Sequence, residues 1–365
     1  MSWRDKIAAV LAGKVGGPTP TGIHVYHSSP HDFDRFDLSK IGTGEGAQVY
    51  GHGIYAAENP AVSGQGGQYW QQFLPRFEGA ERFAADRLKG NNFDPGAALK
   101  VAADEVTYWK TKIASIGEQK DSGYYRDRAW AWQDDLKHAQ DQLAKQEAAH
   151  GLLARGDAPI GPRTYEVNFK AKPEELLDWD KPVGQQPRIV DAFRQLGYKE
   201  APRPYSDKLV ADVGGFLDLR SSGEDAYRTA IRHAADRYGH TDRGTNARYA
   251  SEMLGEAGIP GIRYLDEGSR NMYGLHQGMI DNYGSREAAL ANAQKRLASG
   301  MGDPEHYRSA VEALSKPPTH NYVAFDPSKL DIMAKYGVVG ATGGVPLGAA
   351  TMGGTIDQST YGERQ

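Results

Sequence analysis

Short strand-like segments recur along this chain, but the stretches between them differ widely in length and character. The apolar and β-branched runs lie at 23–27, 54–57, 165–169, 262–265 and 322–325. The chain shows no fixed internal repeat and no regular alternation of strands and helices. Unequal connections of this kind are typical of a mixed sheet rather than of a doubly wound parallel sheet. The sequence therefore predicts an α+β fold whose sheet is assembled from segments far apart in the chain.

The longest interval between strand-like segments is predicted to be helical. From Pro75 to Ala158 the residues Ala, Gln, Lys, Asp and Glu dominate. Their spacing predicts two long helices, Ala97–Ile116 and Tyr125–Leu153, joined by a turn at Gly117–Gly123. This hairpin carries no residues in a catalytic spacing, and we therefore expect it to be an insertion.

Further helices are expected in the second half of the chain. Ser222 and Asp225 have the spacing of a capping box and predict a helix that continues to Tyr238. A helix over Thr245–Ala257 is expected to end at Gly258, and a helical pair is expected across 285–314.

These patterns divide the chain into five parts. They are an N-terminal arm (1–20), the first part of the core (21–75), the hairpin insertion (76–158), the second part of the core (159–335, with a helical insertion at about 273–314) and a Gly/Ala-rich tail (336–365). The run 336–356 has no charge but is rich in Gly, so we expect a tether there and no stable membrane span. The N-terminal segment lacks the unbroken apolar stretch of a secretory signal.

Charge and cysteine content exclude several classes of function. The chain has 43 Lys and Arg against 47 Asp and Glu, and its net charge of −4 disfavours nucleic acid as the main partner. With 0 Cys, disulfides, thiolate nucleophiles and Cys-ligated metals are excluded. Histidines occur at 24, 27, 31 and 52, but no His-Glu-x-x-His helix is present, so no metal site is expected. Ser28 and Ser29 lack the glycines of a nucleophile elbow, so a serine hydrolase is not expected.

Four segments in order carry a resemblance to a known family. They are Val25–Pro30, Tyr50–Glu58, Gly261–Asp266 with Ser269 and Arg270, and Asn321–Asp326. Together they resemble the NAD-dependent ADP-ribosyltransferases of the diphtheria-toxin and poly(ADP-ribose) polymerase branch. The subgroup found in bacteriophage and prophage polyvalent proteins is most similar, and it shares Asp178–Pro182 as well. The matching stretches, 22–75, 163–187, 244–270 and 318–336, leave most of the chain unmatched.

The resemblance implies an ADP-ribosyltransferase-like split antiparallel sheet with large helical insertions, and NAD⁺ as substrate. It implies that His27 hydrogen-bonds the adenosine ribose and that the backbone of Ser28 holds the nicotinamide amide, although the family prefers Gly there. It also implies that the ring of Tyr55 packs against nicotinamide. Ser63 matches a hydroxyl that contacts the carboxamide, and Tyr69 can serve as the second stacking tyrosine.

Asn321 occupies the position of the family's usual catalytic Glu. Cleavage of the ribose–nicotinamide bond builds positive charge on the sugar, which a carboxylate stabilises and an amide does not. Loss of such a group typically costs about 10²–10³ in rate. The resemblance therefore implies transfer of a single ADP-ribose at a reduced rate, or a role for another acid: Glu267, Asp266 or Glu58.

Each site residue also has an ordinary structural interpretation. A histidine at a strand end is commonly structural, and a single tyrosine of this kind is commonly a core aromatic. The order of the four segments favours a mono-ADP-ribosyltransferase that modifies a host macromolecule, with a host protein as the expected acceptor. Two alternatives remain: a virion structural or ejected internal protein with a catalytically degenerate transferase fold, and an NAD⁺ glycohydrolase. The phage resemblance implies location in the virion or the bacterial cytoplasm, with the tail binding other virion proteins.

Overall fold

The structure is a computed structural model, and it describes residues 22–41, 48–126, 128–155, 160–201, 215–239 and 242–338. The predicted N-terminal arm and the tail beyond residue 338 lie outside the described residues. The same holds for part of the glycine-rich stretch, residues 42–47.

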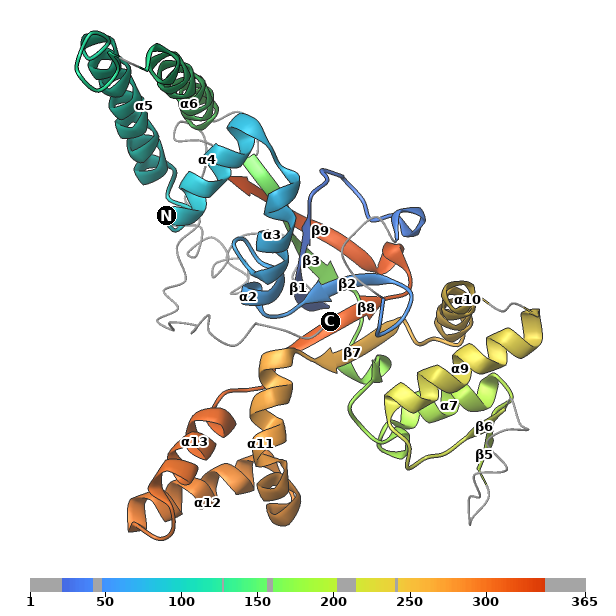
Figure 1. Cartoon of the computed structure of the whole chain (residues 1–365). Helices are drawn as coiled ribbons and strands as arrows, with labels where there is room; N and C mark the ends of the chain where they lie inside the picture. Colours follow the sequence, from blue (N-terminus) through green and yellow to red (C-terminus); the bar gives the residue numbers. More distant parts are fainter. Residues whose placement is uncertain are drawn as a thin grey trace, which may run out of the picture. The chain divides into compact units, whose positions relative to one another are not determined.

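One seven-stranded sheet dominates the fold, in the order β4-β7-β8-β2-β1-β3-β9, and β5 pairs with β6 separately (Figure 1). The strands are β1 (Ile23–Ser29), β2 (Ile54–Ala57), β3 (Ile160–Phe169), β4 (Leu177–Asp178), β5 (Lys199–Glu200), β6 (Phe216–Leu217), β7 (Gly261–Leu265), β8 (His320–Ala324) and β9 (Leu330–Val338). The predicted α+β class is confirmed. The sheet is mixed rather than wholly antiparallel, because β4 runs parallel to β7.

The chain divides into two compact units. Leu74–Gly161 forms one unit, with α4 (Gly79–Gly90), α5 (Pro95–Glu118) and α6 (Ala129–Arg155). Residues 22–73 and 162–336 form the other, which holds most of the large sheet. Its helices are α2 (Pro60–Ser63), α3 (Gln68–Phe73), α7 (Pro187–Gln195), α9 (Gly223–Tyr238), α10 (Arg243–Glu256), α11 (Glu267–Tyr283), α12 (Arg286–Ser299) and α13 (Pro304–Ser315).

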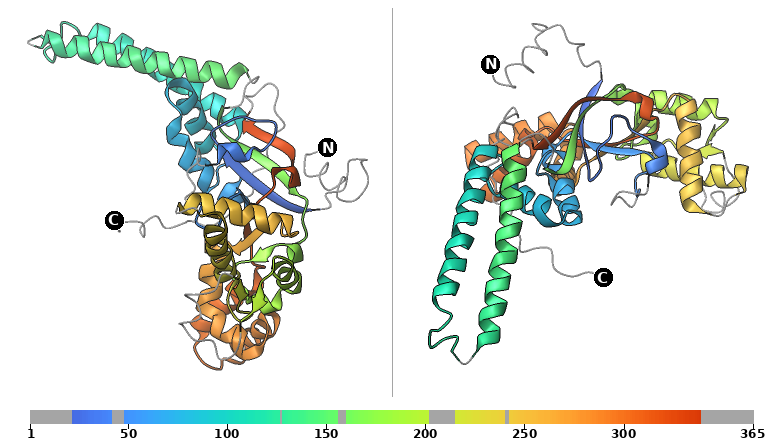
Figure 2. Two further views of the ribbon diagram at one scale, coloured as in Figure 1. Left: turned by 90° about the vertical axis from the view of Figure 1, so that its right-hand side faces the viewer. Right: turned by 90° about the horizontal axis from the view of Figure 1, so that it is seen from above.

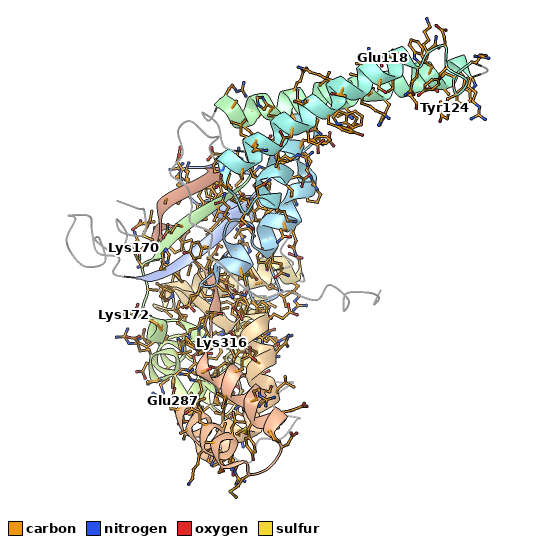
Figure 3. All side chains as sticks on the ribbon, turned by 90° about the vertical axis from the view of Figure 1, so that its left-hand side faces the viewer. Glu118, Tyr124, Lys170, Lys172, Glu287 and Lys316 are labelled. Carbon is orange, nitrogen blue, oxygen red and sulfur yellow. The ribbon has the colours of Figure 1, made fainter. Side chains whose placement is uncertain are left out.

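The first unit contains the predicted helical hairpin. Helices α5 and α6 run side by side in both views of Figure 2, and the indole of Trp132 donates to the carbonyl of Ile116 at 2.9 Å. Glu118 and Tyr124 lie at the far end of this hairpin (Figure 3). Helix α6 begins at Ala129 rather than at Tyr125, because Tyr125 belongs to the turn.

The large sheet has two buried faces that can be told apart by strand register. Residues paired across antiparallel strands share a face. Asn321 pairs with Ala57 and with Tyr264, and Tyr55 pairs with Val323, so these residues define one face, the Asn321 face. His27 pairs with Tyr165 on the other, the His27 face.

Each face is covered by its own set of apolar side chains. On the Asn321 face, Ile262, Tyr264 and Val323 belong to a cluster that includes residues of α7, α9 and α10. On the His27 face, Val25, Tyr165, Val167 and Tyr322 form a second cluster, and Phe33, Phe36 and Leu38 from the segment after β1 pack against it.

Local sequence signals account for several element boundaries. The capping box of Ser222 and Asp225 is formed and opens α9 as predicted. The predicted helix 245–257 corresponds to α10, and the predicted pair across 285–314 corresponds to α12 and α13. Helix α11 opens the predicted helical insertion at Glu267, earlier than the expected start at about 273, since Asp266 caps it by accepting from the Ser269 N–H at 2.6 Å. The predicted tail starts inside β9, which continues to Val338.

Candidate functional site

The four sequence segments that carry the resemblance lie on four neighbouring strands. Val25–Pro30 contributes β1, Tyr50–Glu58 contributes β2, Gly261–Asp266 contributes β7 and Asn321–Asp326 contributes β8. In the sheet these strands stand in the order β7-β8-β2-β1 (Figure 1). Segments almost 300 residues apart in the chain are therefore brought together in one half of the sheet.

The sheet opens between β1 and β2. Strand β1 pairs with β3 along its whole length, from Ile23 to Ser29, but its pairing with β2 is limited to Tyr26 and Ala57. Where the backbone pairing ends, Nδ1 of His27 lies 2.7 Å from the carbonyl oxygen of Tyr55. A side chain thus continues the contact between the two strands at the point where the ladder stops.

The surroundings of His27 favour a neutral imidazole. Its ring packs edge-on against Phe36 at 5.2 Å and lies 6.1 Å from both Phe33 and Tyr165. Burial is the larger influence and lowers the pKa of His27, while the hydrogen bond with the Tyr55 backbone opposes it. Because a carbonyl only accepts, Nδ1 carries the proton, and Nε2 is left as an acceptor. Among the described residues Nε2 has no hydrogen-bond partner.

The hydroxyl of Tyr55 holds the loop that precedes its own strand. It donates to the carbonyl of Gly51 at 2.9 Å and accepts from the N–H of Tyr50 at 3.2 Å. Burial raises the pKa of Tyr55, so the hydroxyl stays protonated. Since both hydrogen bonds are internal, the ring rather than the hydroxyl is the part of Tyr55 that can meet a ligand.

Ser28 and Ser63 come together next to these strands. The hydroxyl of Ser28 donates to the carbonyl of Ser63, the last residue of α2, at 2.7 Å. Both serines are buried. Ser28 lies two residues beyond Tyr26 and therefore on the Asn321 face, which brings three expected site residues, Ser28, Tyr55 and Asn321, to one face.

Asn321 carries a buried amide oxygen that lacks a partner. Its Oδ1 is inaccessible to solvent and makes no hydrogen bond within the described part of the chain. Burial raises the pKa of its strand neighbour Tyr264, and a hydrogen-bonding interaction with the Asn321 side chain opposes this rise. The amide oxygen beside Tyr264 therefore remains an unused acceptor. An unsatisfied buried acceptor costs about 1–3 kcal/mol and indicates a missing donor.

Tyr264, Tyr50 and Arg270 extend this group, and sequence reasoning did not assign them a role. The rings of Tyr50 and Tyr264 stack at 3.7 Å with an interplanar angle of 7°. Arg270 donates from Nη1 to the hydroxyl of Tyr50 at 2.7 Å, and from Nη2 to Asp180 at 3.0 Å. Tyr50 and Arg270 stand at the ends of segments that carry the resemblance and Tyr264 lies inside one, and this placement is the signal that the sequence offers for them.

Tyr69 of α3 lies near the same tyrosines. Burial is the main cause that raises its pKa, and Tyr50 and Glu267 add to the shift through their charges. Tyr69 also contributes to the raised pKa values of Tyr55 and Tyr264. Tyr69, and Glu267 at the exposed start of α11, therefore influence these tyrosines electrostatically.

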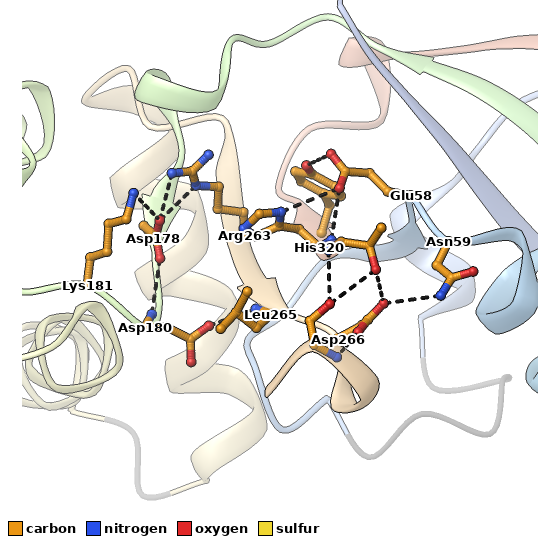
Figure 4. A network of polar contacts seen from close by, with 12 residues as sticks. Glu58, Asn59, Asp178, Asp180, Lys181, Arg263, Leu265, Asp266 and His320 are labelled. Carbon is orange, nitrogen blue, oxygen red and sulfur yellow. Dashed lines mark hydrogen bonds and ion pairs between the residues drawn. The ribbon is translucent and has the colours of Figure 1, made fainter. Parts of the chain in front are cut away.

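The other two carboxylates proposed as substitutes are occupied elsewhere (Figure 4). Glu58 accepts from the N–H of His320 at 2.9 Å and from the hydroxyl of Tyr322. Burial raises the pKa of Glu58, but these hydrogen bonds outweigh it and lower the pKa overall. Asp266 caps α11 and also accepts from Thr319 and, at 3.4 Å, from Asn59. Within the described residues neither carboxylate forms a hydrogen bond with the side chain of Asn321.

The shared segment Asp178–Pro182 connects the site to the sheet edge. Asp178 is buried and binds Arg263 of β7 at 2.7 Å (Figure 4). Trp179 meets Tyr50 edge-on at 5.2 Å. Asp180 accepts from the N–H of Leu265 at 2.7 Å.

Within the described residues no group of three or more His, Cys, Asp or Glu side chains is placed to hold a metal ion. His24 is instead paired with Glu166 at 2.5 Å. The described helices include none that is long and apolar enough to cross a membrane.

Comparison of the chain with protein-family models, with curated proteins and with solved structures found no match in any of the three.

Proposed function

We propose that this chain binds NAD⁺ on the Asn321 face of its sheet, next to the opening between β1 and β2, and transfers ADP-ribose to a host protein. The observation that carries the proposal is the adjacency of β7, β8, β2 and β1, because these strands bear the four resembling segments. The proposed fold is accordingly an ADP-ribosyltransferase-like split sheet with helical insertions. The proposed setting, a phage virion or an infected bacterial cytoplasm, follows from the resemblance alone.

The donor and acceptor groups of the site suit the parts of NAD⁺. His27 lies on the opposite face of the sheet, and its Nδ1, 2.7 Å from the carbonyl of Tyr55, holds the strand end beside the site. The ring of Tyr55 offers a flat surface for nicotinamide, and the backbone of Ser28 can bind the carboxamide. Ser63 and Tyr69 stand beside these groups. The free Oδ1 of Asn321 can accept from the ribose 2′-hydroxyl.

The reaction breaks the bond between C1′ of the ribose and the nicotinamide nitrogen. Nicotinamide leaves with the electron pair, a nucleophile of the acceptor attacks C1′, and the acceptor loses a proton to solvent or to a nearby base. The sugar is oxocarbenium-like at the transition state. Asn321 orients the 2′-hydroxyl but brings no charge, so we expect slow turnover and a single transfer.

The test incubates purified protein with NAD⁺ and bacterial lysate and follows both nicotinamide release and ADP-ribosyl labelling. Wild type is compared with Tyr55→Ala and Asn321→Ala, which we expect to reduce release at least about tenfold. Tyr108→Ala, which removes an exposed tyrosine on α5, serves as the control and is expected to match wild type. If wild type releases no more nicotinamide than Tyr55→Ala, the proposal that this chain is an enzyme is contradicted.

A second candidate function is NAD⁺ hydrolysis, and the Asn321 position favours it. Without a carboxylate beside the ribose, no charged group orients a protein acceptor, and water can take its place. Release of nicotinamide without labelling of any lysate component would select this function.

A further inference from the structure

Beyond the residues of the proposed site, a chain of contacts leads from the Asp178–Pro182 segment to Tyr264. We infer that Asp180 and Arg270 are positioning residues that hold the ring of Tyr50 over Tyr264, and that the partly exposed Tyr50, with the buried Tyr264 behind it, forms an aromatic wall beside Asn321 that the ligand contacts. This inference rests on the proposed function for the identity of the ligand, but the positioning itself can be tested without it.

Asp180 is the fixed end of the chain of contacts. One of its carboxylate oxygens accepts from the N–H of Leu265 at 2.7 Å, which ties it to the end of β7. The other accepts from Nη2 of Arg270 at 3.0 Å. Because both oxygens are used, the carboxylate sets the direction of the Arg270 side chain.

Arg270 transmits this position to Tyr50 in two ways. Its Nη1 donates to the hydroxyl of Tyr50 at 2.7 Å, and its guanidinium carbon lies 5.6 Å from the centre of the Tyr50 ring. A planar guanidinium can donate to a carboxylate and to a phenol at the same time through its two Nη atoms. The single ammonium nitrogen of a lysine cannot reproduce this planar arrangement.

Tyr50 is also held by its backbone, through the Tyr55 hydroxyl. The two anchors leave its ring parallel to Tyr264 at 3.7 Å, with Trp179 against its edge at 5.2 Å. Tyr264 is the strand neighbour of Asn321, so the stacked rings stand next to the unpartnered amide oxygen. Flat aromatic walls of this kind favour planar ring ligands through stacking.

The experiment measures KM and kcat for nicotinamide release in Tyr50→Phe, Arg270→Lys, Arg270→Met and Asp180→Asn. We expect KM for NAD⁺ to rise about tenfold with kcat changed less than about threefold, because a positioned surface contributes binding that is equal in ground and transition states. The matched control is Arg248→Met, since Arg248 also lies over a tyrosine ring, at 4.9 Å from Tyr249, and beside an acid, Glu252. It is expected to match wild type.

Hydrogen exchange of segment 48–53 provides the second readout. Arg270→Met is expected to increase exchange in this segment about tenfold, and Arg248→Met is expected to leave it unchanged. Unchanged exchange in both Arg270→Met and Tyr50→Phe would overturn the positioning of Tyr50. If exchange rises but KM stays at the wild-type value, the wall does not bind the ligand. If wild type has no turnover at all, the proposed function fails, and the exchange result alone decides the positioning.

Discussion

At the scale of single residues, the site depends on polar atoms whose partners are incomplete. Asn321 has a buried acceptor without a donor, and Nε2 of His27 has no partner among the described residues. Buried polar groups are normally satisfied, so the unpartnered Oδ1 of Asn321 indicates a place where a donor-bearing molecule binds, whereas Nε2 of His27 lies on the opposite face. Ribose hydroxyls are donors of this kind.

The protonation state of His27 predicts how stability depends on pH. Its folded-state pKa is lowered, so the unfolded chain takes up protons first as the pH falls. The His27 contribution to stability is therefore fully present above about pH 6.5 and is lost progressively below it. His52 and His276 are shifted in the same direction, mainly by burial, and they add to this dependence.

Urea unfolding between pH 7.5 and 5.5 checks this prediction. Wild type is expected to lose stability over this range. His27→Phe, which keeps an aromatic ring in place, is expected to be less stable at pH 7.5 but to lose less on acidification. Equal pH dependence in the two proteins would show that His27 does not change its charge on unfolding.

At the scale of elements, the sheet relies on glycines where strands approach closely. A Cβ atom on Gly53 would lie 2.4 Å from the carbonyl oxygen of Ala324, and one on Gly261 would lie 2.2 Å from that of Val323. Both carbonyls belong to β8 and cannot move without disturbing the ladder that aligns Asn321 with Tyr264.

Gly53→Ala is accordingly expected to destabilise the protein by about 3 kcal/mol or more in chemical denaturation. The matched control is Gly255→Ala in α10, where an added Cβ meets nothing within 4 Å. In that helix the substitution is expected to be neutral or to stabilise by up to about 1 kcal/mol. A Gly53→Ala protein as stable as wild type would mean that β2 and β8 do not approach as closely as described.

Helix and strand positions were largely predictable, because periodicity and caps are local. The hairpin helices, the capped start of α9 and strand β2 agree closely with the pattern of the sequence. The start of α11 at Glu267 was not predicted. Asp266 caps the helix through the N–H of Ser269, but both residues also lie in a segment that carries the family resemblance. Helix α7 was not predicted either. Its first residue, Pro187, comes directly after a short turn at Val183–Gln185 and is not distinguished from a turn proline by local sequence.

The site was predictable only in part, because it is made by long-range pairing. The sequence indicated His27, Ser28, Tyr55, Ser63, Tyr69 and Asn321 through short motifs. The contact between Tyr50 and Arg270 joins residues separated by 220 positions, and no local pattern predicts such a pair. The same holds for the ion pair of Arg270 with Asp180.

At the scale of the whole molecule, the residues of the site all belong to one compact unit, whereas the long hairpin belongs to the other. The hairpin exposes large aromatic side chains, Tyr108, Tyr124 and Trp130. A unit without site residues is expected to be dispensable for the chemistry, even if it affects which macromolecule is modified.

Shortening the hairpin tests this division. The ring of Trp109 faces His138 at 6.0 Å, and Trp132 bonds to Ile116, so residues 106 and 142 face each other across the hairpin. Replacement of 107–141 by a short Gly-Asn turn keeps the base of the hairpin, including the 3.3 Å ion pair of Arg87 with Glu105. Nicotinamide release is expected to stay within about twofold of wild type, because no proposed ligand contact is removed. Loss of labelling with release retained would assign acceptor binding to the hairpin, whereas loss of release in a normally folded protein would show that the site is not confined to the sheet unit.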